Sequence, residues 1–296
     1  MYARPPTLIA ADIGNSRIKL GRFERIDQCP GASLDGSLPI AGPPLPEPSD
    51  ALDLPIRIET GEFDTERFAV WCGTLPPDAA WLVASVHRGA TEMLAAAVAE
   101  IAARTNGAWP LRQVTYRDIP IAIEVDEPER VGIDRLLAAF AADRLRARGR
   151  PAIVVDLGTC IKVDLVTAEG AFAGGAILPG IAMAARALNE QTDALPRVAL
   201  QTLDQPFAPL GKSTVPAIEA GLYWGAVGAI REIAHRLSAN LAAPPSLVLT
   251  GGASPAVTEL LAQNETWELR HVPHLTLAGI ALVDESLANA ANTNAD

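Results

Sequence analysis

The sequence predicts an α/β fold that is duplicated, with two similar halves and a cleft between them. Residues 9–16 read Ile-Ala-Ala-Asp-Ile-Gly-Asn-Ser, and residues 153–160 read Ile-Val-Val-Asp-Leu-Gly-Thr-Cys, 144 positions further on. Each segment is an apolar strand followed by an Asp, an aliphatic residue, a Gly and a small polar residue, and a second strand follows each turn. Apolar residues at helical spacing occupy much of the remaining chain, as expected for two α/β domains.

Residues 1–147 form the predicted first domain, which begins with the first hairpin and carries one irregular insertion. Residues 27–55 hold seven Pro with several Gly and Ser, a composition typical of an exposed loop. Asn106 and Gly107 provide a stop signal for the helix that precedes them. The expected strands are 8–11, 18–23, 56–59 and 81–86. One helix is expected to begin at Asp64, and two more are expected at 89–104 and 132–149.

Residues 148–296 form the predicted second domain, with a last helix able to pack back across the boundary. Pro151 precedes an apolar strand that again ends in an acid, Asp156. The expected strands are 152–155, 161–166, 172–178 and 247–249, and the expected helices are 181–191, 215–240, 255–263 and 276–290.

The helix beginning near Val215 carries more apolar surface than one outward face of a monomer should show. The large apolar residues are Ile218, Leu222, Tyr223, Trp224, Val227 and Ile230. A two-fold dimer through this helix would explain them. The alternative is a central helix that is buried within its own domain.

Composition and charge exclude several classes of partner. The chain has 296 residues, 49% of them hydrophobic, and its formal net charge is −11. Because such a chain is repelled by phosphate backbones, we expect no nucleic-acid partner. No apolar run approaches a membrane span, so we expect no membrane partner. Three Cys without CxxC spacing are typical of a reducing compartment, and a cytoplasmic location is expected.

The two hairpin turns have the chemistry of phosphate-binding loops. A Gly lets backbone N–H groups approach an anion closely, and Asn15, Ser16 and Thr159 add short donors. Asp12 and Asp156 would repel a bare triphosphate. They are therefore compatible with a nucleotide only if cations such as Mg²⁺ lie between carboxylates and phosphates.

Two further features favour a nucleotide ligand. Lys19 on the return strand could reach a phosphate, and Thr250-Gly251-Gly252 between a strand and a helix offers a third backbone approach. Each signal alone is more often an ordinary turn. Together, in this order, they resemble the actin, hexokinase and heat-shock-chaperone ATPase superfamily, which implies a ribonuclease-H-like, actin/hexokinase-type two-domain fold with ATP in the interdomain cleft.

Further motifs narrow the resemblance to one family. They are Asp12-Ile13-Gly14-Asn15-Ser16-Arg17-Ile18-Lys19, Gly132-Ile133-Asp134-Arg135, Asp156-Leu157-Gly158-Thr159, Gly174-Gly175 through Pro179-Gly180, Leu195-Pro196, Gly211-Lys212-Ser213-Thr214 and Thr250-Gly251-Gly252. In this order, over about residues 7–285, they resemble type III pantothenate kinase. The proline-rich insertion lies outside the resemblance.

This resemblance implies transfer of the γ-phosphoryl group of ATP to the hydroxyl of pantothenate, the first step of coenzyme A synthesis. It implies that Asp134 is the general base and that Gly132, Ile133 and Arg135 line the substrate site. Thr214 would contact pantothenate from the neighbouring subunit of a homodimer. The residues implied to hold ATP are Asp12, Ile13, Gly14, Asn15, Ser16, Arg17, Ile18, Lys19, Thr159, Gly251 and Gly252.

The resemblance also implies two cations. Asp156 would lie at a site for a monovalent cation, K⁺ or NH₄⁺, and Asp12 would hold Mg²⁺ through water. The residues alone leave plainer alternatives open, because Asp134 could be a helix cap and Arg135 a surface charge.

Two departures from the family pattern bear on activity. Val125 stands where the family commonly has a Tyr, so one contact to pantothenate would be missing or replaced. Lys162 stands where the family usually has a Thr, and its ammonium could bind ATP, replace the monovalent cation or point outward. Because Asp156 is retained, we expect Lys162 to point away from it.

Three functions follow from these observations. The first is an active pantothenate kinase, which Asp12, Lys19, Asp134 and Asp156 favour. The second is a family member that has lost turnover and acts as a binding or regulatory protein. The third is a kinase of another small hydroxy acid.

Overall fold

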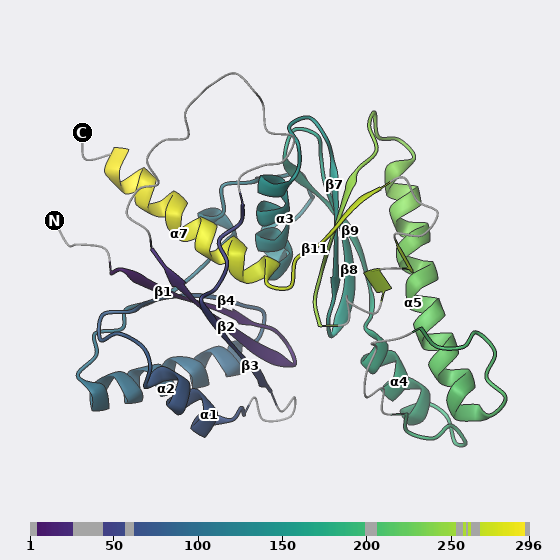
Figure 1. The fold of residues 1–296 in the computed structure, drawn as a ribbon, viewed down its shortest axis with the longest axis horizontal. Coiled ribbons are helices and arrows are strands. Elements are labelled where there is room, and N and C mark those ends of the chain that lie inside the picture. The colour runs from purple at the N-terminus through teal and green to yellow at the C-terminus, as the bar shows by residue number, and fades with distance from the viewer. Residues whose placement is uncertain are drawn as a thin grey trace. The chain divides into compact units, whose positions relative to one another are not determined.

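A computed structural model gives the fold (Figure 1). It describes residues 5–25, 44–56, 62–198, 206–252, 257–258, 260–261 and 267–293. The chain divides into two compact units. Unit 1 consists of Met1–Ile121, Glu127–Leu145 and His274–Asp296, and unit 2 consists of Ala122–Asp126 and Arg146–Pro273.

Unit 1 contains a five-stranded sheet in the order β3-β2-β1-β4-β5. The strands are β1 (Thr7–Ile13), β2 (Arg17–Glu24), β3 (Asp50–Pro55), β4 (Ala80–Ser85) and β5 (Leu111–Gln113). The first three strands pair antiparallel, and β1, β4 and β5 run parallel. Almost every residue of β1 is buried because helices cover both faces of the sheet, which accounts for its continuous apolar run (Figure 1).

Four helices pack on this sheet. They are α1 (Thr65–Cys72), α2 (Arg88–Thr105), α3 (Ile133–Leu145) and α7 (Leu275–Thr293). Asp64 caps α1 by accepting the Arg67 N–H, and Asn106 ends α2 in the left-handed conformation at φ 51°, so both predicted signals are confirmed.

The C-terminal helix, for which the sequence left a return across the domain boundary open, belongs to unit 1. A Cβ on Gly279 of α7 would lie 2.4 Å from the Leu137 carbonyl oxygen of α3, so the two backbones touch there. Arg25, just after β2, donates from Nε and Nη2 to both carboxylate oxygens of Asp284 at 2.8 and 2.7 Å. Residues 274–293 therefore pack with the other segments of unit 1.

The expected proline-rich loop is interrupted by a strand. β3 lies within residues 27–55 and pairs along β2, with Leu54 fully buried. Residues 26–43 of the expected loop, and residues 57–59 of the strand expected at 56–59, lie outside the described residues; Ile56 follows β3 and is not in a strand. The frequent Pro hid a short edge strand, a position where Pro is tolerated.

Unit 2 contains a six-stranded sheet in the order β11-β10-β7-β8-β9-β6. The strands are β6 (Ala122–Ile123), β7 (Ala152–Leu157), β8 (Cys160–Val166), β9 (Ala171–Pro179), β10 (Ser246–Thr250) and β11 (Glu268–His271). Without β6, and read from the other end, this order is β9-β8-β7-β10-β11, which matches β3-β2-β1-β4-β5 of unit 1 strand for strand. The first two pairs in each sheet are antiparallel and the last two are parallel. The predicted duplication of an α/β domain is confirmed.

The helices of unit 2 include α4 (Ile181–Glu190) and α5 (Thr214–Ser238), and residues 257–258 and 260–261 are also helical. The rest of the helix expected at 255–263 lies outside the described residues. Among the helices described, none combines the length and the apolar character that crossing a membrane requires.

The apolar side chains of α5 are accounted for within unit 2. Tyr223, Val227 and Ile230 are at most 1% exposed, and they pack with β7 and β10 in one core. Leu222 and Trp224 pack against the same core. The inference that this helix presents surplus apolar surface is wrong, because its own sheet covers that face.

Candidate functional site

The first hairpin places a carboxylate and an ammonium side by side. Asp12 on β1 is the register partner of Lys19 on β2, and both side chains are half-buried. The Gly14 N–H donates to the Arg17 carbonyl at 2.9 Å and closes the turn. Asn15 at the tip is exposed, so its amide is accessible to a ligand.

Asp53 and His274 lie near this hairpin, and neither was assigned to the site from the sequence. Arg17 Nη1 donates to Asp53 of β3 at 2.9 Å, an exposed pair that orients the guanidinium along the sheet edge. The pKa of His274 is lowered, chiefly by desolvation and then by the positive charge of Lys19. Their proximity depends on β3 and on the return of α7 to unit 1, which no local motif indicates.

Asp134 lies in the first turn of α3 in unit 1. Gly132 precedes the helix, and its carbonyl accepts the Arg135 N–H at 3.0 Å. The same N–H lies 3.0 Å from Asp134 Oδ1, so the carboxylate is held at the helix N-terminus. A Cβ on Gly132 would lie 2.6 Å from that oxygen, so a larger residue at 132 would displace the Asp134 carboxylate. Asp134 is thus inside the helix and is not the cap residue itself.

The second hairpin repeats the opposed pair and corrects one expectation. Lys162 Nζ donates to Asp156 Oδ2 at 2.7 Å, and the two side chains are 18% and 19% exposed. The expectation that Lys162 points away from Asp156 is wrong, because the antiparallel register of β7 and β8 sets the two residues directly opposite. The Gly158 N–H closes the turn on the Cys160 carbonyl at 3.1 Å, with Thr159 half-buried between them.

The glycine turn after β10 packs against the second hairpin. Thr250 is the register partner of Asp156, and Gly251 follows with φ +97°. A Cβ on Gly251 would lie 2.5 Å from the Leu157 carbonyl oxygen and 2.7 Å from Asp156 Oδ1. Only Gly permits this conformation and this approach. Gly252 is exposed, with open space where a Cβ would be.

Thr214 begins α5 in unit 2 and is exposed. Gly211 lies close to the first turn of this helix, where a Cβ would come within 2.2 Å of the Ala217 nitrogen. Val125, also in unit 2, packs beside Gly174 of β9, with Cγ1 3.5 Å from the position of a Cβ there. The side chain at 125 therefore lies against β9 in unit 2.

A model of the type III pantothenate kinase family matches residues 8–236. The chain belongs to this family. Two relatives named type III pantothenate kinase are similar along nearly the whole chain, and a third matches a shorter part. That of Parafrankia sp. (strain EAN1pec) is 35% identical over 284 residues, 94% of this chain and 97% of its own, and that of Frankia alni is 34% identical over 278 residues, 94% and 98%. That of Acidiphilium cryptum is 38% identical over 174 residues, 59% and 62%.

Solved structures that resemble this fold have lower sequence identity to the chain than these pantothenate kinases. The ethanolamine utilization protein EutJ from Carboxydothermus hydrogenoformans has a TM-score of 0.48 at 14% identity, covering 95% of this chain and 90% of that one. MreB 5 of Spiroplasma citri bound to AMPPNP has a TM-score of 0.49 at 8% identity, covering 98% and 99%.

In this type III pantothenate kinase family member, each unit brings part of the expected site together. Unit 1 gathers Asp12 and Lys19 on one hairpin and carries Asp134 at the start of α3. Unit 2 gathers Asp156, Lys162 and Gly251 around the second hairpin.

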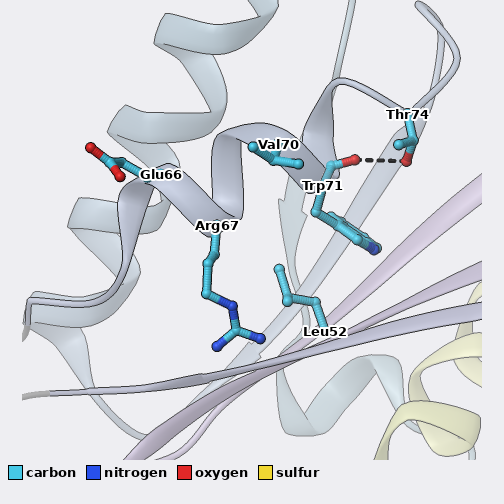
Figure 2. Close-up of a pocket in the computed structure, with 6 residues that line it drawn as sticks. All are labelled: Leu52, Glu66, Arg67, Val70, Trp71 and Thr74. Carbon is cyan, nitrogen blue, oxygen red and sulfur yellow. Dashed lines mark hydrogen bonds between the residues drawn. The ribbon is translucent and has the colours of Figure 1, made fainter.

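A shallow hollow of the described surface lies elsewhere in unit 1. It measures about 500 Å³ and lies between β3 and α1. Its lining residues are Leu52, Glu66, Arg67, Val70, Trp71 and Thr74 (Figure 2). It contains none of the residues that the family motifs indicate, and its walls are mainly apolar, so it does not fit a triphosphate.

Proposed function

We propose that this chain phosphorylates pantothenate with ATP, giving 4′-phosphopantothenate and ADP, the first committed reaction of coenzyme A synthesis. The observation that carries the proposal is the family match over residues 8–236, together with relatives that are similar over 94% of the chain. The local geometry of Asp134 and of the two hairpins supports it. We place the enzyme in the cytoplasm, where ATP is available.

Asp134 is the general base in this proposal. The pantothenate hydroxyl oxygen forms a bond to the γ-phosphorus, the bond from that phosphorus to the β–γ bridging oxygen breaks, and ADP leaves. The hydroxyl proton passes to the Asp134 carboxylate. The backbone N–H of Arg135, at 3.0 Å from Asp134 Oδ1, orients the carboxylate for this transfer. The Arg135 guanidinium is suited to the carboxylate of pantothenate.

The two hairpins hold the nucleotide. Gly14 and Gly158 allow the backbone close to phosphate oxygens, and Asn15 and Thr159 add side-chain donors. Asp12 suits Mg²⁺, which usually takes one or two protein carboxylates and completes its shell with water and phosphate. When bound, Mg²⁺ neutralises charge on the phosphates. In the described part of the chain, no three His, Cys, Asp or Glu side chains cluster as metal ligands, so Mg²⁺ would rely on the nucleotide.

The active form is proposed to be a homodimer in which Thr214 of one copy contacts pantothenate bound beside Asp134 of the other. Thr214 is exposed at the start of α5, which leaves its hydroxyl accessible. The surface that joins the copies is not the apolar face of α5, since unit 2 buries it.

A coupled ADP-release assay tests the function directly. We expect ADP release that requires ATP, Mg²⁺ and pantothenate together. ADP release with other small hydroxy acids, but not with pantothenate, would replace the proposed substrate. A folded protein that binds ATP without any turnover would favour a regulatory member of the family.

A further inference from the structure

The repeat between the two halves extends beyond the turns into the return strands. Asp12 opposes Lys19 in the first hairpin, and Asp156 opposes Lys162 in the second. In the second hairpin the ammonium and the carboxylate form an ion pair of 2.7 Å, and more than four fifths of each side chain is buried. A pair with so little exposure is a fixed part of the hairpin, unlike a surface salt bridge.

The use of lysine in this chain makes position 162 informative. The sequence has 21 Arg and only three Lys, and the three are Lys19, Lys162 and Lys212. Each lies in a motif with glycine or a carboxylate suited to phosphate chemistry, whereas every other cation of the chain is Arg. Lys carries a compact, strongly hydrated point charge, and Arg carries a broad planar fork. The second hairpin therefore has the side chain that most closely resembles a small monovalent cation.

The carboxylate oxygens of Asp156 are not available to a free monovalent cation. Such an ion binds through oxygen atoms, and Oδ2 of Asp156 already accepts the ammonium of Lys162. Oδ1 faces the Gly251 backbone, where even one added carbon would lie 2.7 Å away. An added K⁺ would have to displace an ammonium of equal charge that is tethered to the next strand.

We propose that the ammonium of Lys162 takes the place of the free monovalent cation beside Asp156. It neutralises this carboxylate and so removes the repulsion that a phosphate would otherwise meet at the second hairpin. Lys162 is thus a nucleotide-binding residue, and the enzyme works without added K⁺ or NH₄⁺. This inference rests on the proposed phosphoryl transfer from ATP.

Turnover in two salts gives the first test. The unmodified enzyme is assayed in choline chloride and in potassium chloride of equal ionic strength. We expect kcat/KM for ATP to agree within about twofold, because the required charge is already covalently present. Activation by K⁺ of about tenfold or more would overturn the proposal.

Chemical rescue gives the second test. Lys162→Met removes the charge but keeps most of the side-chain volume, so kcat/KM in choline should fall by at least about tenfold and recover when K⁺ or NH₄⁺ is added. Arg104→Met is the matched control, because it removes one cation from an exposed pair with Glu100 on α2. Full activity of Lys162→Met in choline would contradict the proposal. Lys162→Thr serves as the second variant if the Met variant does not fold, and the salt comparison on the unmodified enzyme decides the question without any variant.

A binding measurement separates this inference from the proposed function. Calorimetric titration with Mg-ATP needs no pantothenate and no turnover. We expect equal ATP affinity of the unmodified chain in choline and in potassium, and K⁺-dependent affinity of Lys162→Met. That pattern would support the role of Lys162 even if pantothenate were not the substrate. ATP affinity of the unmodified chain that depends on K⁺ would overturn it even if pantothenate were phosphorylated.

Discussion

Asp134 combines a carboxylate at a helix N-terminus with a backbone hydrogen bond that an amide oxygen can also accept. Asp134→Asn should therefore keep α3 intact while it removes the proton acceptor. We expect kcat to fall by roughly 10²-fold or more, the usual size of a general-base contribution. Steady-state kinetics measures the loss, and thermal unfolding followed by circular dichroism verifies the fold. Near-normal turnover in a folded variant would contradict the assignment of Asp134 as the base.

The cysteines allow the second hairpin to be probed without turnover. Cys72 is 1% exposed and burial raises the pKa of its thiol to about 12, whereas Cys160 is half-buried at the start of β8, next to Thr159. In a Cys29→Ser background at about pH 8, iodoacetamide should modify Cys160 and leave Cys72 intact. Mg-ATP should slow the reaction at Cys160, because the nucleotide would cover this turn.

Mass spectrometry of the peptides measures both labelling rates. Modification of Cys72 in the unfolded chain is the control for reagent access. Equal rates at Cys160 with and without Mg-ATP would remove the second hairpin from the nucleotide site.

The residues of the two turns are predictable from the sequence, but the contacts of their side chains are not. The two Asp and the Gly of each turn could be predicted, since strand ends and glycines leave a local signal. The direction of Lys162 could not, because it depends on the register between β7 and β8. The contact of Gly251 with Asp156 depends in the same way on strands about 90 positions apart in the chain. Pairing across a sheet is a tertiary property.

A buried ion pair joins the residue after β2 to α7. Arg25 and Asp284 are 10% and 12% exposed and share two hydrogen bonds. Arg25→Met should lower the free energy of unfolding by about 3 kcal/mol, because it leaves a buried carboxylate without its cation. The control Arg88→Met breaks an exposed pair with Glu92 and should cost less than about 0.5 kcal/mol. Urea titrations of both variants make the comparison, and equal losses would show that the burial of the first pair contributes nothing.

The central elements of the fold were predictable and the edge elements were not. β1, β7 and β10 are buried apolar runs, and α2 has clear helical periodicity with a stop signal. β3 and β11 lie at sheet edges and contain several polar residues, so their sequences lack a strand pattern. α5 is predictable as a helix, but the sequence leaves open whether its own domain or a second copy covers its apolar face.

A mixture of two inactive variants tests the proposed homodimer. Asp134→Asn subunits lack the base, and Thr214→Arg subunits block the substrate contact. If each site takes Asp134 from one copy and Thr214 from the other, a mixed dimer has one site with both lesions and one site with neither. Random exchange should then restore about a quarter of the unmodified activity. No recovery in a mixture that demonstrably exchanges subunits would reject the shared site.

The membership of α7 in unit 1 has a consequence for synthesis on the ribosome. Domains of a growing chain usually fold from the N-terminus onward, yet the helix that covers β1 and the carboxylate that pairs with Arg25 are translated after all of unit 2. Unit 2 has its main segment in one stretch, so it can close around its own core first. At 5–20 residues per second, translation from residue 146 to the end of α7 takes roughly 7 to 30 seconds. During that interval the nascent first sheet exposes an apolar face, which makes it the part of the newborn chain most in need of a chaperone.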